Sequence, residues 1–383
     1  MSDRGDIWPL AFYVNLGSAY ELRVAFYDDI NSTWSRTSVG MDFFSAQTLP
    51  QRTGWCWLPT GTWGYMIVES GSLDLELWTN ADTGWRAGGA WSVLDDYTSV
   101  DYDSVDVKVR QNYVWAVAKK DSSNFFDIFS IRTETGTPAL GVVQSPGARI
   151  ADTGYSFDLD KTLAGTIHIA GVDTVTAGLT YFGPSAEPTL PIDWQNTIKA
   201  AGASPEIICD NYNNVFAFFT DSNILYMSIW DGNSSTAWPQ QEVVYIASDT
   251  LTHDYAVTHN PNDDTFHVVI VNYDSVAAAY TLVYRRRTRN GWEEPLDIEI
   301  LSMLSLPPMG FCCPQITIDQ HNNLRIFVIK KDFSVPRGDI NSYYLPNIEY
   351  QYYSNPLTWA NTTDIDDSSD DIVALDAPRR CIP

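Results

Sequence analysis

The chain has 383 residues, in which 48 acidic side chains outnumber 23 basic ones and give a formal net charge of −25. Because negative charge repels phosphate backbones and anionic lipid, this composition argues against nucleic acid as a partner and against binding to membrane surfaces. A hydrophobic content of 44 % is ample for a folded core and argues against global disorder. No run of about 18 apolar residues occurs, so no membrane insertion is expected.

The amino terminus and the cysteines indicate where the chain is made. Residues 1–9 lack a basic stretch followed by an apolar one, so we expect no signal peptide and synthesis in a reducing cytoplasm. The five cysteines form no CxxC pair, and their odd number does not suggest a disulfide framework or a zinc site. We therefore expect them to be buried thiols.

Short apolar or alternating runs of residues, bounded by turn formers, recur along the chain and predict an all-β fold. The first residues of one aromatic-rich run type are successively 51, 53, 53, 46, 57 and 66 positions apart. A period of about fifty residues is expected of four-stranded propeller blades. The run occurs seven times, at Leu22–Tyr27, Leu73–Trp78, Phe126–Ile131, Leu179–Phe182, Leu225–Trp230, Leu282–Arg286 and Ile348–Tyr353.

Each aromatic run has companions in a constant order, which predict the other strands of a blade. A more continuously apolar run, such as Val215–Phe219, often precedes it, and an alternating run ending in Asp or Asn comes before that. Two-residue hairpins are expected at Asn213-Asn214 and Asn322-Asn323, because Asn tolerates positive φ. A tryptophan that would wedge between blades usually follows the aromatic run, at Trp34, Trp85, Trp194, Trp238, Trp292 and Trp359.

These patterns predict one domain, residues 1–383, with an all-β fold: a seven-bladed β-propeller of four-stranded antiparallel blades. A lone twisted sheet cannot bury both faces, whereas sheets stacked around an axis bury them and protect their edges. The first repeat is short, so we expect the segment 370–376, containing Asp371–Asp376, to complete the first blade and close the ring. A β-sandwich or two small β domains are the alternative. The blades are expected at residues 8–45, 54–95, 104–145, 153–199, 204–247, 253–300 and 313–362.

The order of strand, Asn-Asn turn, strand, Asp turn, aromatic strand and Trp resembles the sialidase-like and fucose-type lectin propellers. Sialidase-like propellers carry an S-x-D-x-G-x-x-W box, from which the nearest match, Asp82–Trp85, departs. Their arginine triad draws on different blades, whereas Arg285, Arg286, Arg287 and Arg289 fall in one strand. Alternation places the first and third of these on one face and the second on the other. We expect them to pair with carboxylates between blades, with anion binding as the alternative.

The resemblance to fucose-type lectins implies a ligand-binding site. Such propellers hold sugar with an Arg in an L-R-[IV]-x-[FY]-like strand, a Glu on the next strand and a Trp face, which together satisfy vicinal hydroxyls and apolar sugar faces. The corresponding residues are Arg325, Glu349 and Trp359, and Arg23 repeats the first element without a corresponding Glu. An ordinary cross-strand pair between Arg325 and Glu349 is the alternative.

One acidic segment offers carboxylates to a metal ion. Asp364, Asp366 and Asp370 are candidate Ca²⁺ ligands. The segment lacks the Gly and the terminal Glu of an EF-hand loop, so a solvated acidic connector is favoured over a Ca²⁺ site. No other cofactor is expected.

The sequence assigns no catalytic residue. Acidic pairs such as Asp263-Asp264 fall in expected turns and do not stand out among 48 acidic residues. His168 and His267 occupy equivalent second-strand positions, which are compatible with facing the central channel, and polysaccharide-lyase propellers use channel-side His and Tyr. Hydrogen-bonded packing inside the blade is the favoured interpretation of both histidines.

These features predict a non-catalytic recognition propeller, which is a glycan-binding or docking module with a glycan or protein partner. A homo-oligomer or a multi-protein assembly would suit such a module. An acidic, aromatic-rich chain without a signal peptide suits a structural or attachment component of a virion tail that is released by lysis. A propeller-type glycoside hydrolase or polysaccharide lyase is the first alternative, and an intracellular protein-interaction scaffold is the second.

Overall fold

The computed structural model shows an all-β protein, which confirms that part of the prediction. In the described part of the chain, no helix is long and apolar enough to cross a membrane. The chain divides into a terminal unit, residues 1–43, 86–88 and 245–383, and a central unit, residues 44–85 and 89–244. The residues described are 7–16, 20–28, 33–37, 43–44, 54–57, 63–68, 73–80, 91–110, 113–121, 123, 125–132, 139–144, 157–162, 166–173, 178–185, 194–199, 201–230, 238, 240–249, 255–319, 321–335, 337–345, 360–362, 371–377 and 380–381.

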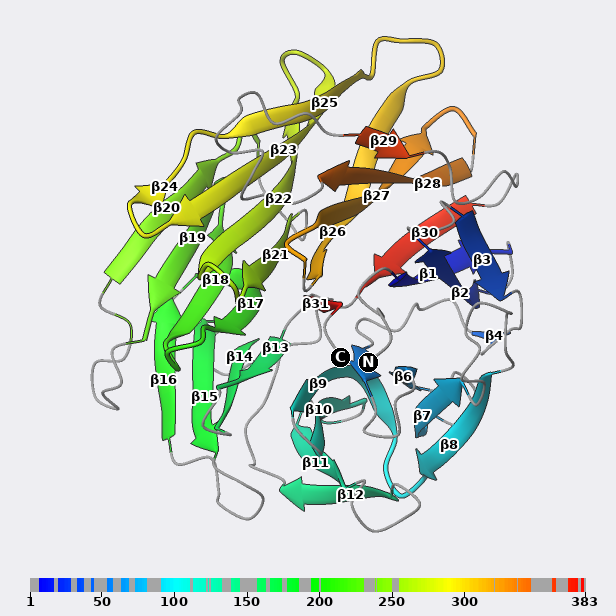
Figure 1. Cartoon of the computed structure of the whole chain (residues 1–383), viewed down its shortest axis with the longest axis vertical. Helices are drawn as coiled ribbons and strands as arrows, with labels where there is room; N and C mark the ends of the chain where they lie inside the picture. Colours follow the sequence, from blue (N-terminus) through cyan, green and yellow to red (C-terminus); the bar gives the residue numbers. More distant parts are fainter. Residues whose placement is uncertain are drawn as a thin grey trace. The chain divides into compact units, whose positions relative to one another are not determined.

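The central unit contains four sheets of four strands each, in the orders β5-β6-β7-β8, β12-β11-β10-β9, β13-β14-β15-β16 and β17-β18-β19-β20 (Figure 1). Neighbouring strands follow one another in the chain, as expected of propeller blades. The strands are β5 (Gly54–Trp57), β6 (Trp63–Val68), β7 (Leu75–Asn80), β8 (Trp91–Tyr97), β9 (Tyr102–Arg110), β10 (Tyr113–Lys120), β11 (Phe126–Arg132), β12 (Ala139–Gln144), β13 (Phe157–Lys161), β14 (Ile167–Val172), β15 (Leu179–Ser185), β16 (Trp194–Lys199), β17 (Ala203–Cys209), β18 (Val215–Asp221), β19 (Ile224–Ile229) and β20 (Gln240–Ile246).

The terminal unit contains a five-stranded sheet, β21-β22-β23-β24 with β25 paired to β23, and a ten-stranded sheet. The ten-stranded sheet follows the order β3-β2-β1-β30-β28-β27-β26-β31, with β4 beside β2 and β29 beside β28. The strands are β1 (Ile7–Asn15), β2 (Tyr20–Asp28), β3 (Thr33–Thr37), β4 (Phe43–Phe44), β21 (Tyr255–Asn260), β22 (Thr265–Asp274), β23 (Ala279–Thr288), β24 (Gly291–Trp292), β25 (Leu296–Ser302), β26 (Met309–Asp319), β27 (Leu324–Asp332), β28 (Arg337–Leu345), β29 (Ala360–Thr362), β30 (Asp371–Asp376) and β31 (Arg380–Cys381).

The third strands of the sheets carry the aromatic repeat. Strands β2, β7, β11, β15, β19 and β23 contain or overlap the first six aromatic runs. The seventh prediction differs, because the strand that pairs with β27 is β28, whereas Ile348–Tyr353 lies outside the described residues. The run Arg337–Leu345 alternates less clearly in sequence than the aromatic segment after it, so the sequence pattern favours the later segment as the strand.

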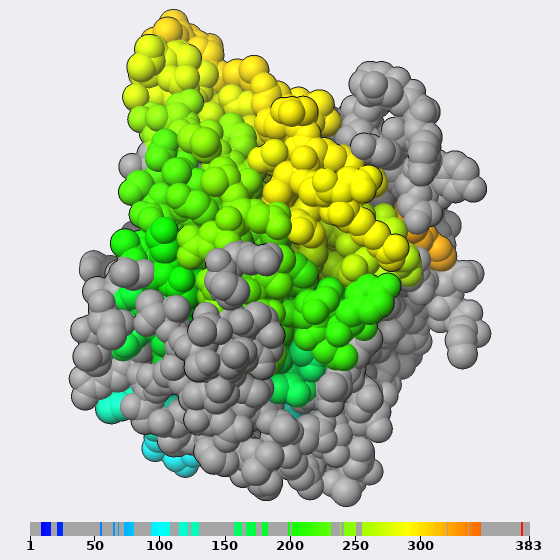
Figure 2. All heavy atoms as spheres, turned by 90° about the vertical axis from the view of Figure 1, so that its left-hand side faces the viewer, coloured from blue at the N-terminus to red at the C-terminus, as the bar shows by residue number. Residues whose placement is uncertain are grey.

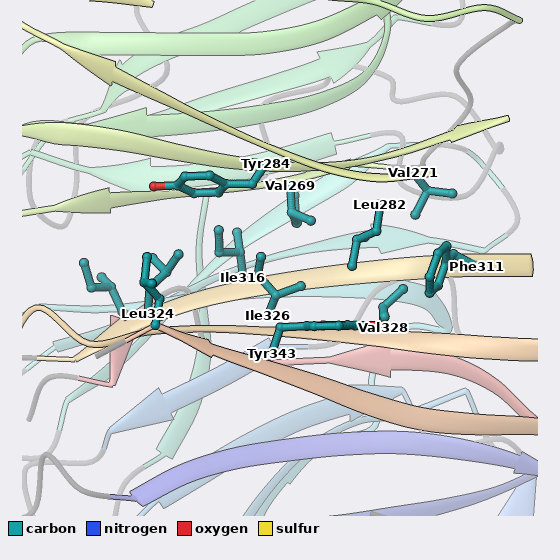
Figure 3. Packing of buried hydrophobic residues seen from close by; sticks show 13 residues of the cluster. Val269, Val271, Leu282, Tyr284, Phe311, Ile316, Leu324, Ile326, Val328 and Tyr343 are labelled. Carbon is teal, nitrogen blue, oxygen red and sulfur yellow. The ribbon is translucent and has the colours of Figure 1, made fainter. Parts of the chain in front are cut away.

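Successive sheets bury their apolar faces against each other. In the central unit, Trp115 and Phe126 of the second sheet share one cluster with Phe157 and Ile169 of the third. In the terminal unit, side chains of β22 and β23 face those of β26 and β27, as Val269, Leu282 and Ile326 show in Figure 3. Burying one such large apolar side chain contributes about 1.5–3 kcal/mol. Trp238, 6 % exposed, belongs to such a cluster, as expected for a wedge.

The Asn-Asn segments form turns that are longer than predicted. Cys209 pairs with Val215, so five residues form the loop between β17 and β18. Asp210 Oδ1 accepts hydrogen bonds from the Tyr212 and Asn214 N–H groups, at 2.8 Å each, and Oδ2 accepts one from Asn214 Nδ2 at 2.7 Å. Asp319 caps the turn before β27 in the same way. Positive φ occurs at Asn213 (65°) and Asn322 (62°), as predicted for these two.

Two aspartates of β13, of which Asp158 is buried and Asp160 partly buried, link the first strands of successive sheets in the central unit. Asp158 Oδ2 on β13 accepts a hydrogen bond from the backbone N–H of Ile207 on β17 at 2.6 Å. Asp160 Oδ2 accepts one from the Cys209 N–H at 2.7 Å. These carboxylates provide hydrogen-bond acceptors for backbone N–H groups of the edge strand β17, which the close stacking of the sheets keeps from water.

Strand β30, near the carboxyl terminus, pairs with β1. β30 lies antiparallel to β1, with Ala11 opposite Asp376 and Asn15 opposite Asp371. In Figure 1 this red strand lies beside the dark blue β1. It provides the fourth strand beside β1, β2 and β3, where the first repeat is short.

Replacing Asp158 by Ala should lower the free energy of unfolding by about 1–3 kcal/mol, because it leaves the buried Ile207 N–H without its acceptor. Urea denaturation measures the change. Asp158→Asn keeps an acceptor oxygen and should lose less, and Asp101→Ala, at an exposed position, should stay within about 0.5 kcal/mol of wild type. Equal midpoints for Asp158→Ala and wild type would contradict the role assigned to this carboxylate.

Deleting residues 371–383 should lower the thermal midpoint by about 5 °C or more, because β1 loses one of its two partner strands and each 1 kcal/mol shifts the midpoint by about 2–4 °C. Differential scanning calorimetry measures this. Deleting residues 378–383 keeps β30 and should lower the midpoint less. An unchanged midpoint for the longer deletion would show that β30 does not stabilise the first strands.

Candidate active site

The turn between β21 and β22 gathers several chemically active side chains. The backbone N–H of Asp264 donates to the carbonyl of Asn260, and the N–H of Asn262 donates to Asn260 Oδ1, both at 3.0 Å. Asp264 has a φ of 59°, a conformation that Asp tolerates better than most residues. The sequence N-P-N-D-D thus folds into a tight turn that directs the Asp264 carboxylate back toward β21.

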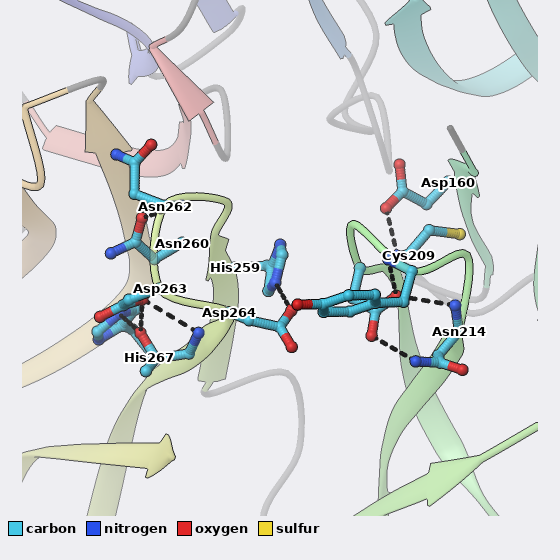
Figure 4. Close-up of polar contacts among 12 residues, drawn as sticks. Asp160, Cys209, Asn214, His259, Asn260, Asn262, Asp263, Asp264 and His267 are labelled. Carbon is cyan, nitrogen blue, oxygen red and sulfur yellow. Dashed lines mark hydrogen bonds and ion pairs between the residues drawn. The ribbon is translucent and has the colours of Figure 1, made fainter. Parts of the chain in front are cut away.

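His259 and Asp264 form a closely paired imidazole and carboxylate. His259 Nε2 lies 2.8 Å from Asp264 Oδ1, and the two side chains point toward each other in Figure 4. The His259 side chain is 0 % exposed, whereas that of Asp264 is 20 % exposed. The imidazole ring also packs on Phe266, with ring centroids 5.0 Å apart. The Asp264 carboxylate is therefore partly exposed to solvent, while the buried His259 ring that binds it is held in place by packing.

Burial and nearby charges shift the pKa of Asp264 in opposite directions. Burial raises the pKa of its carboxyl, while the charges of Arg289 and Arg287 lower it. Burial has the larger effect, so the pKa of Asp264 lies above its usual range. A partly buried carboxyl with a raised pKa is suited to general acid/base chemistry.

A second chain of hydrogen bonds runs beside this pair. Thr265 Oγ1 lies 2.6 Å from Asp263 Oδ1 and 2.9 Å from His267 Nε2, and His267 Nδ1 lies 2.7 Å from the Tyr284 hydroxyl. Burial holds the pKa of His267 well below its ordinary value, with Arg286 and His259 adding to the effect. Because the carboxylate can only accept, the Thr265 hydroxyl donates a hydrogen bond to Asp263 and accepts one from the Nε2–H group of His267. His267 Nδ1 then accepts a hydrogen bond from the Tyr284 hydroxyl, so the imidazole is the tautomer with its proton on Nε2.

The arginines of β23 have partners within their own sheet. Arg285 Nε donates to the carbonyl of Glu293 at 2.6 Å, and its guanidinium lies 5.7 Å from the Trp292 ring centroid. Arg286, 8 % exposed, lies 3.7 Å from the Glu293 carboxylate. Arg286 is buried whereas Arg285 and Arg287 are partly exposed, which agrees with the predicted alternation. Glu293 directly follows β24, and pairing of the arginines with carboxylates of another blade stays a prediction.

The central unit repeats the His–Tyr pair. His168 on β14 pairs through Nδ1 with the Tyr181 hydroxyl on β15, and the rings stack with centroids 5.8 Å apart. His168 is 1 % exposed, and burial lowers its pKa to about 3. The spacing T-x-H before the pair is the same at Thr166 and Thr265. Both histidines are hydrogen-bonded packing residues, which was the favoured interpretation.

Of the site predicted from the lectin resemblance, the structure describes Arg325 and Arg23. Arg325 is 0 % exposed, donates from Nη1 to Ser342 Oγ at 3.2 Å, and lies 4.6 Å from the Tyr344 ring centroid. The register of β27 with β28 places Tyr344 opposite Arg325. Arg23 forms an ion pair with Glu21 at 2.6 Å on the same strand.

Several predicted residues lie outside the described part of the chain. These are Glu349 and Trp359 of the lectin-type site and the candidate Ca²⁺ ligands Asp364, Asp366 and Asp370. Among the residues that are described, no group of three or more His, Cys, Asp or Glu side chains could hold a metal ion. The metal and sugar sites therefore stay predictions.

Sequence reasoning missed His259 and Asp264. The acidic pair Asp263-Asp264 was attributed to a turn, which is correct, but its spacing from His259 carried no catalytic signal. A histidine at the end of a first strand, five residues before an aspartate, is the only trace of the pair in the sequence. Only the turn geometry brings the two side chains together.

No family model and no curated relative matches the chain. Solved structures do, among them a protein from Bacteroides uniformis provisionally named 6-phosphogluconolactonase, with 12 % identity, a TM-score of 0.58, and 97 % of this chain and 99 % of that chain covered. One from Bacteroides fragilis with the same provisional name has 11 % identity, a TM-score of 0.58 and coverage of 98 % and 99 %. A protein from Lactobacillus plantarum has 12 % identity, a TM-score of 0.61 and coverage of 97 % and 99 %.

At these identities the likeness shows the fold, which is all-β and propeller-like. The finer likeness to sialidase-like and fucose-type lectin propellers is not shown. The prediction of a non-catalytic recognition module is contradicted, because propellers matched over nearly their full length carry the names of enzymes. The lectin, adhesion and viral interpretations have no support in these comparisons.

The buried histidines predict a pH dependence of stability. Between pH 6.5 and 5 the unfolded chain binds a proton at His168, whereas the folded chain, with a pKa of about 3, does not. Stability must then fall as pH falls, by about 2 kcal/mol from this residue over that interval. Urea midpoints at pH 7.5 and 5 measure the loss, which should be smaller in His168→Phe. The exposed His321→Gln should keep the wild-type loss, and an identical loss in His168→Phe would contradict this origin.

Proposed function

We propose that this protein is a propeller-type hydrolase that cleaves an anionic, sugar-derived ester such as a sugar lactone. The pairing of His259 with a partly exposed Asp264 near Arg287 and Arg289 is the observation that carries the proposal. The lactonase names of the similar structures support the substrate class. Like the glycoside hydrolase or polysaccharide lyase given as the first alternative from the sequence, this protein would be an enzyme. It would cleave an ester bond instead of a glycosidic bond.

The chemistry assigns one role to each group. Asp264 takes a proton from a water molecule, whose oxygen attacks the ester carbonyl carbon and forms the new C–O bond. The old C–O bond to the ring oxygen breaks, and Asp264 returns the proton to that leaving oxygen. His259 holds Oδ1 of the carboxylate, so it is a positioning residue. Arg289, which is exposed, and Arg287, which is partly exposed, attract the anionic group of the substrate.

The buried His–Tyr pairs favour hydrolysis over lyase chemistry. A lyase needs a base that reaches the substrate, but His267 and Tyr284 are 0 % and 2 % exposed. Burial also raises the pKa of Tyr284 well above its usual range, which disfavours the phenolate. Elimination by these groups would require a reactive form that burial suppresses.

We also propose that the sheets form a seven-bladed ring of one domain, closed by β30. Four sheets of the central unit and one of the terminal unit each supply one blade. The ten-stranded sheet supports two more, β30-β1-β2-β3 and β26-β27-β28-β29, because the bridge between β28 and β30 involves only Gly338 and Asp371.

Replacing Asp264 by Asn should lower kcat for sugar-lactone hydrolysis by about 10²–10⁴-fold, because the amide cannot accept the proton. A panel of phosphorylated, carboxylated and uncharged sugar lactones, followed by proton release, measures the rate. Activity of the wild type should fall as pH falls through the raised pKa of Asp264, since the base must be ionised. Arg289→Ala should raise KM for anionic lactones and leave that for uncharged ones unchanged.

Asp249→Asn is the matched control, because this carboxylate binds the Ser275 N–H in another turn of the same unit. It should keep the wild-type rate. Wild-type protein that hydrolyses none of the lactones, or an Asp264→Asn variant with full activity, would overturn the proposal.

A further inference from the structure

The two adjacent cysteines of the chain lie where strand β26 is irregular. Its pairing with β27 shifts register between Cys312 and Gln315, and Cys313 has a φ of 54°. Positive φ is uncommon for a residue with a side chain and here belongs to a β-bulge. Both sulfurs are thiols in this structure.

The bulge changes the side toward which the two thiols face. In a regular strand, successive side chains point to opposite faces of the sheet. Here both Cys312 and Cys313 pack against the same apolar cluster, formed by Leu10, Phe12, Val14, Ala25, Phe327, Ile329, Ile340 and Ala377. Both are also partly exposed, whereas Cys209 is only 4 % exposed. The two thiols thus lie on one side of the strand and are open to small reagents.

We propose that Cys312 and Cys313 form a redox-active dithiol that a small-molecule disulfide oxidises. One thiolate attacks a sulfur of the reagent, which forms a mixed disulfide and releases the first thiolate. The second cysteine thiolate then attacks the protein-bound sulfur, which forms the Cys312–Cys313 bond and releases the second thiolate. The two protons of the cysteines go to the released thiolates, so the dithiol loses two electrons and the reagent gains them.

Chain geometry makes this bond reversible. Consecutive Cα atoms across a trans peptide lie about 3.8 Å apart, whereas disulfides usually join Cα atoms about 4.4–6.8 Å apart. A bond between adjacent residues is therefore strained, and strained disulfides are easily reduced. The site is suited to a switch and not to a permanent cross-link.

The surroundings of the dithiol connect it to the closing strand. The cluster on which both cysteines pack contains residues of β1 and of β27, together with Ala377, which directly follows β30. Strain from oxidation is therefore expected to loosen the packing of β1 and β27 with the residue that follows β30. This inference is independent of the proposed hydrolase activity.

Treating the full chain with oxidised glutathione tests the proposal. Remaining thiols are alkylated, and the protein is digested with trypsin. Residues 290–325 form one tryptic peptide that contains Cys312 and Cys313 but none of the other three cysteines. We expect this peptide to be lighter by two hydrogen atoms, to carry no adduct, and to regain both thiols with dithiothreitol. The oxidised protein should also have a lower thermal midpoint than the reduced protein.

Variants separate the dithiol from single reactive thiols. Cys312→Ser and Cys313→Ser should each accumulate one glutathione adduct, because the second attack is lost, and Cys209→Ser should oxidise as the wild type does. A wild-type peptide that carries two alkyl groups, two glutathione groups or a link to another cysteine peptide would overturn the proposal, whatever the variants do. An unchanged thermal midpoint after oxidation would overturn the link to the closing strand.

Discussion

Each sheet of this protein has two faces that must be kept from water, and the rest of the structure depends on this constraint. Four short strands supply too little area to bury their own faces, so successive sheets within each unit pack face to face. The resulting contact is close. A Cβ on Gly54 would lie 2.8 Å from the backbone nitrogen of Val107, so only glycine allows β5 to approach β9 in this way.

Close stacking explains why carboxylates occur inside so acidic a protein. In the central unit, backbone N–H groups of β13 and β17 face the preceding sheet, where close stacking keeps water from reaching them. Asp158 and Asp160 accept hydrogen bonds from such groups, and Asp210 and Asp319 do the same inside turns. Part of the acidic excess is therefore structural, and it gives less information about partners than the net charge of −25 suggests.

The same burial decides which groups can do chemistry. His168 and His267 are neutral because they are desolvated, and a tyrosine hydroxyl holds each of them. Asp264 is different, because its turn leaves one fifth of the side chain in contact with solvent while His259 supports it from within. Figure 2 shows the yellow atoms of β23 and β25 on the surface facing the viewer, so the arginine-bearing sheet is accessible there.

The sequence by itself determined the all-β class, six of seven aromatic third strands, the positive φ of Asn213 and Asn322 and the alternation of Arg285 and Arg286, because these follow from local periodicity and backbone sterics. It did not locate β28, whose pattern is weaker than that of the aromatic segment after it. Only the tertiary structure joined His259 to Asp264, placed Tyr344 opposite Arg325 and put Cys312 and Cys313 on one side of β26. Turns, cross-strand register and bulges decide such pairings, and a change of one residue in register reverses the side on which a group lies.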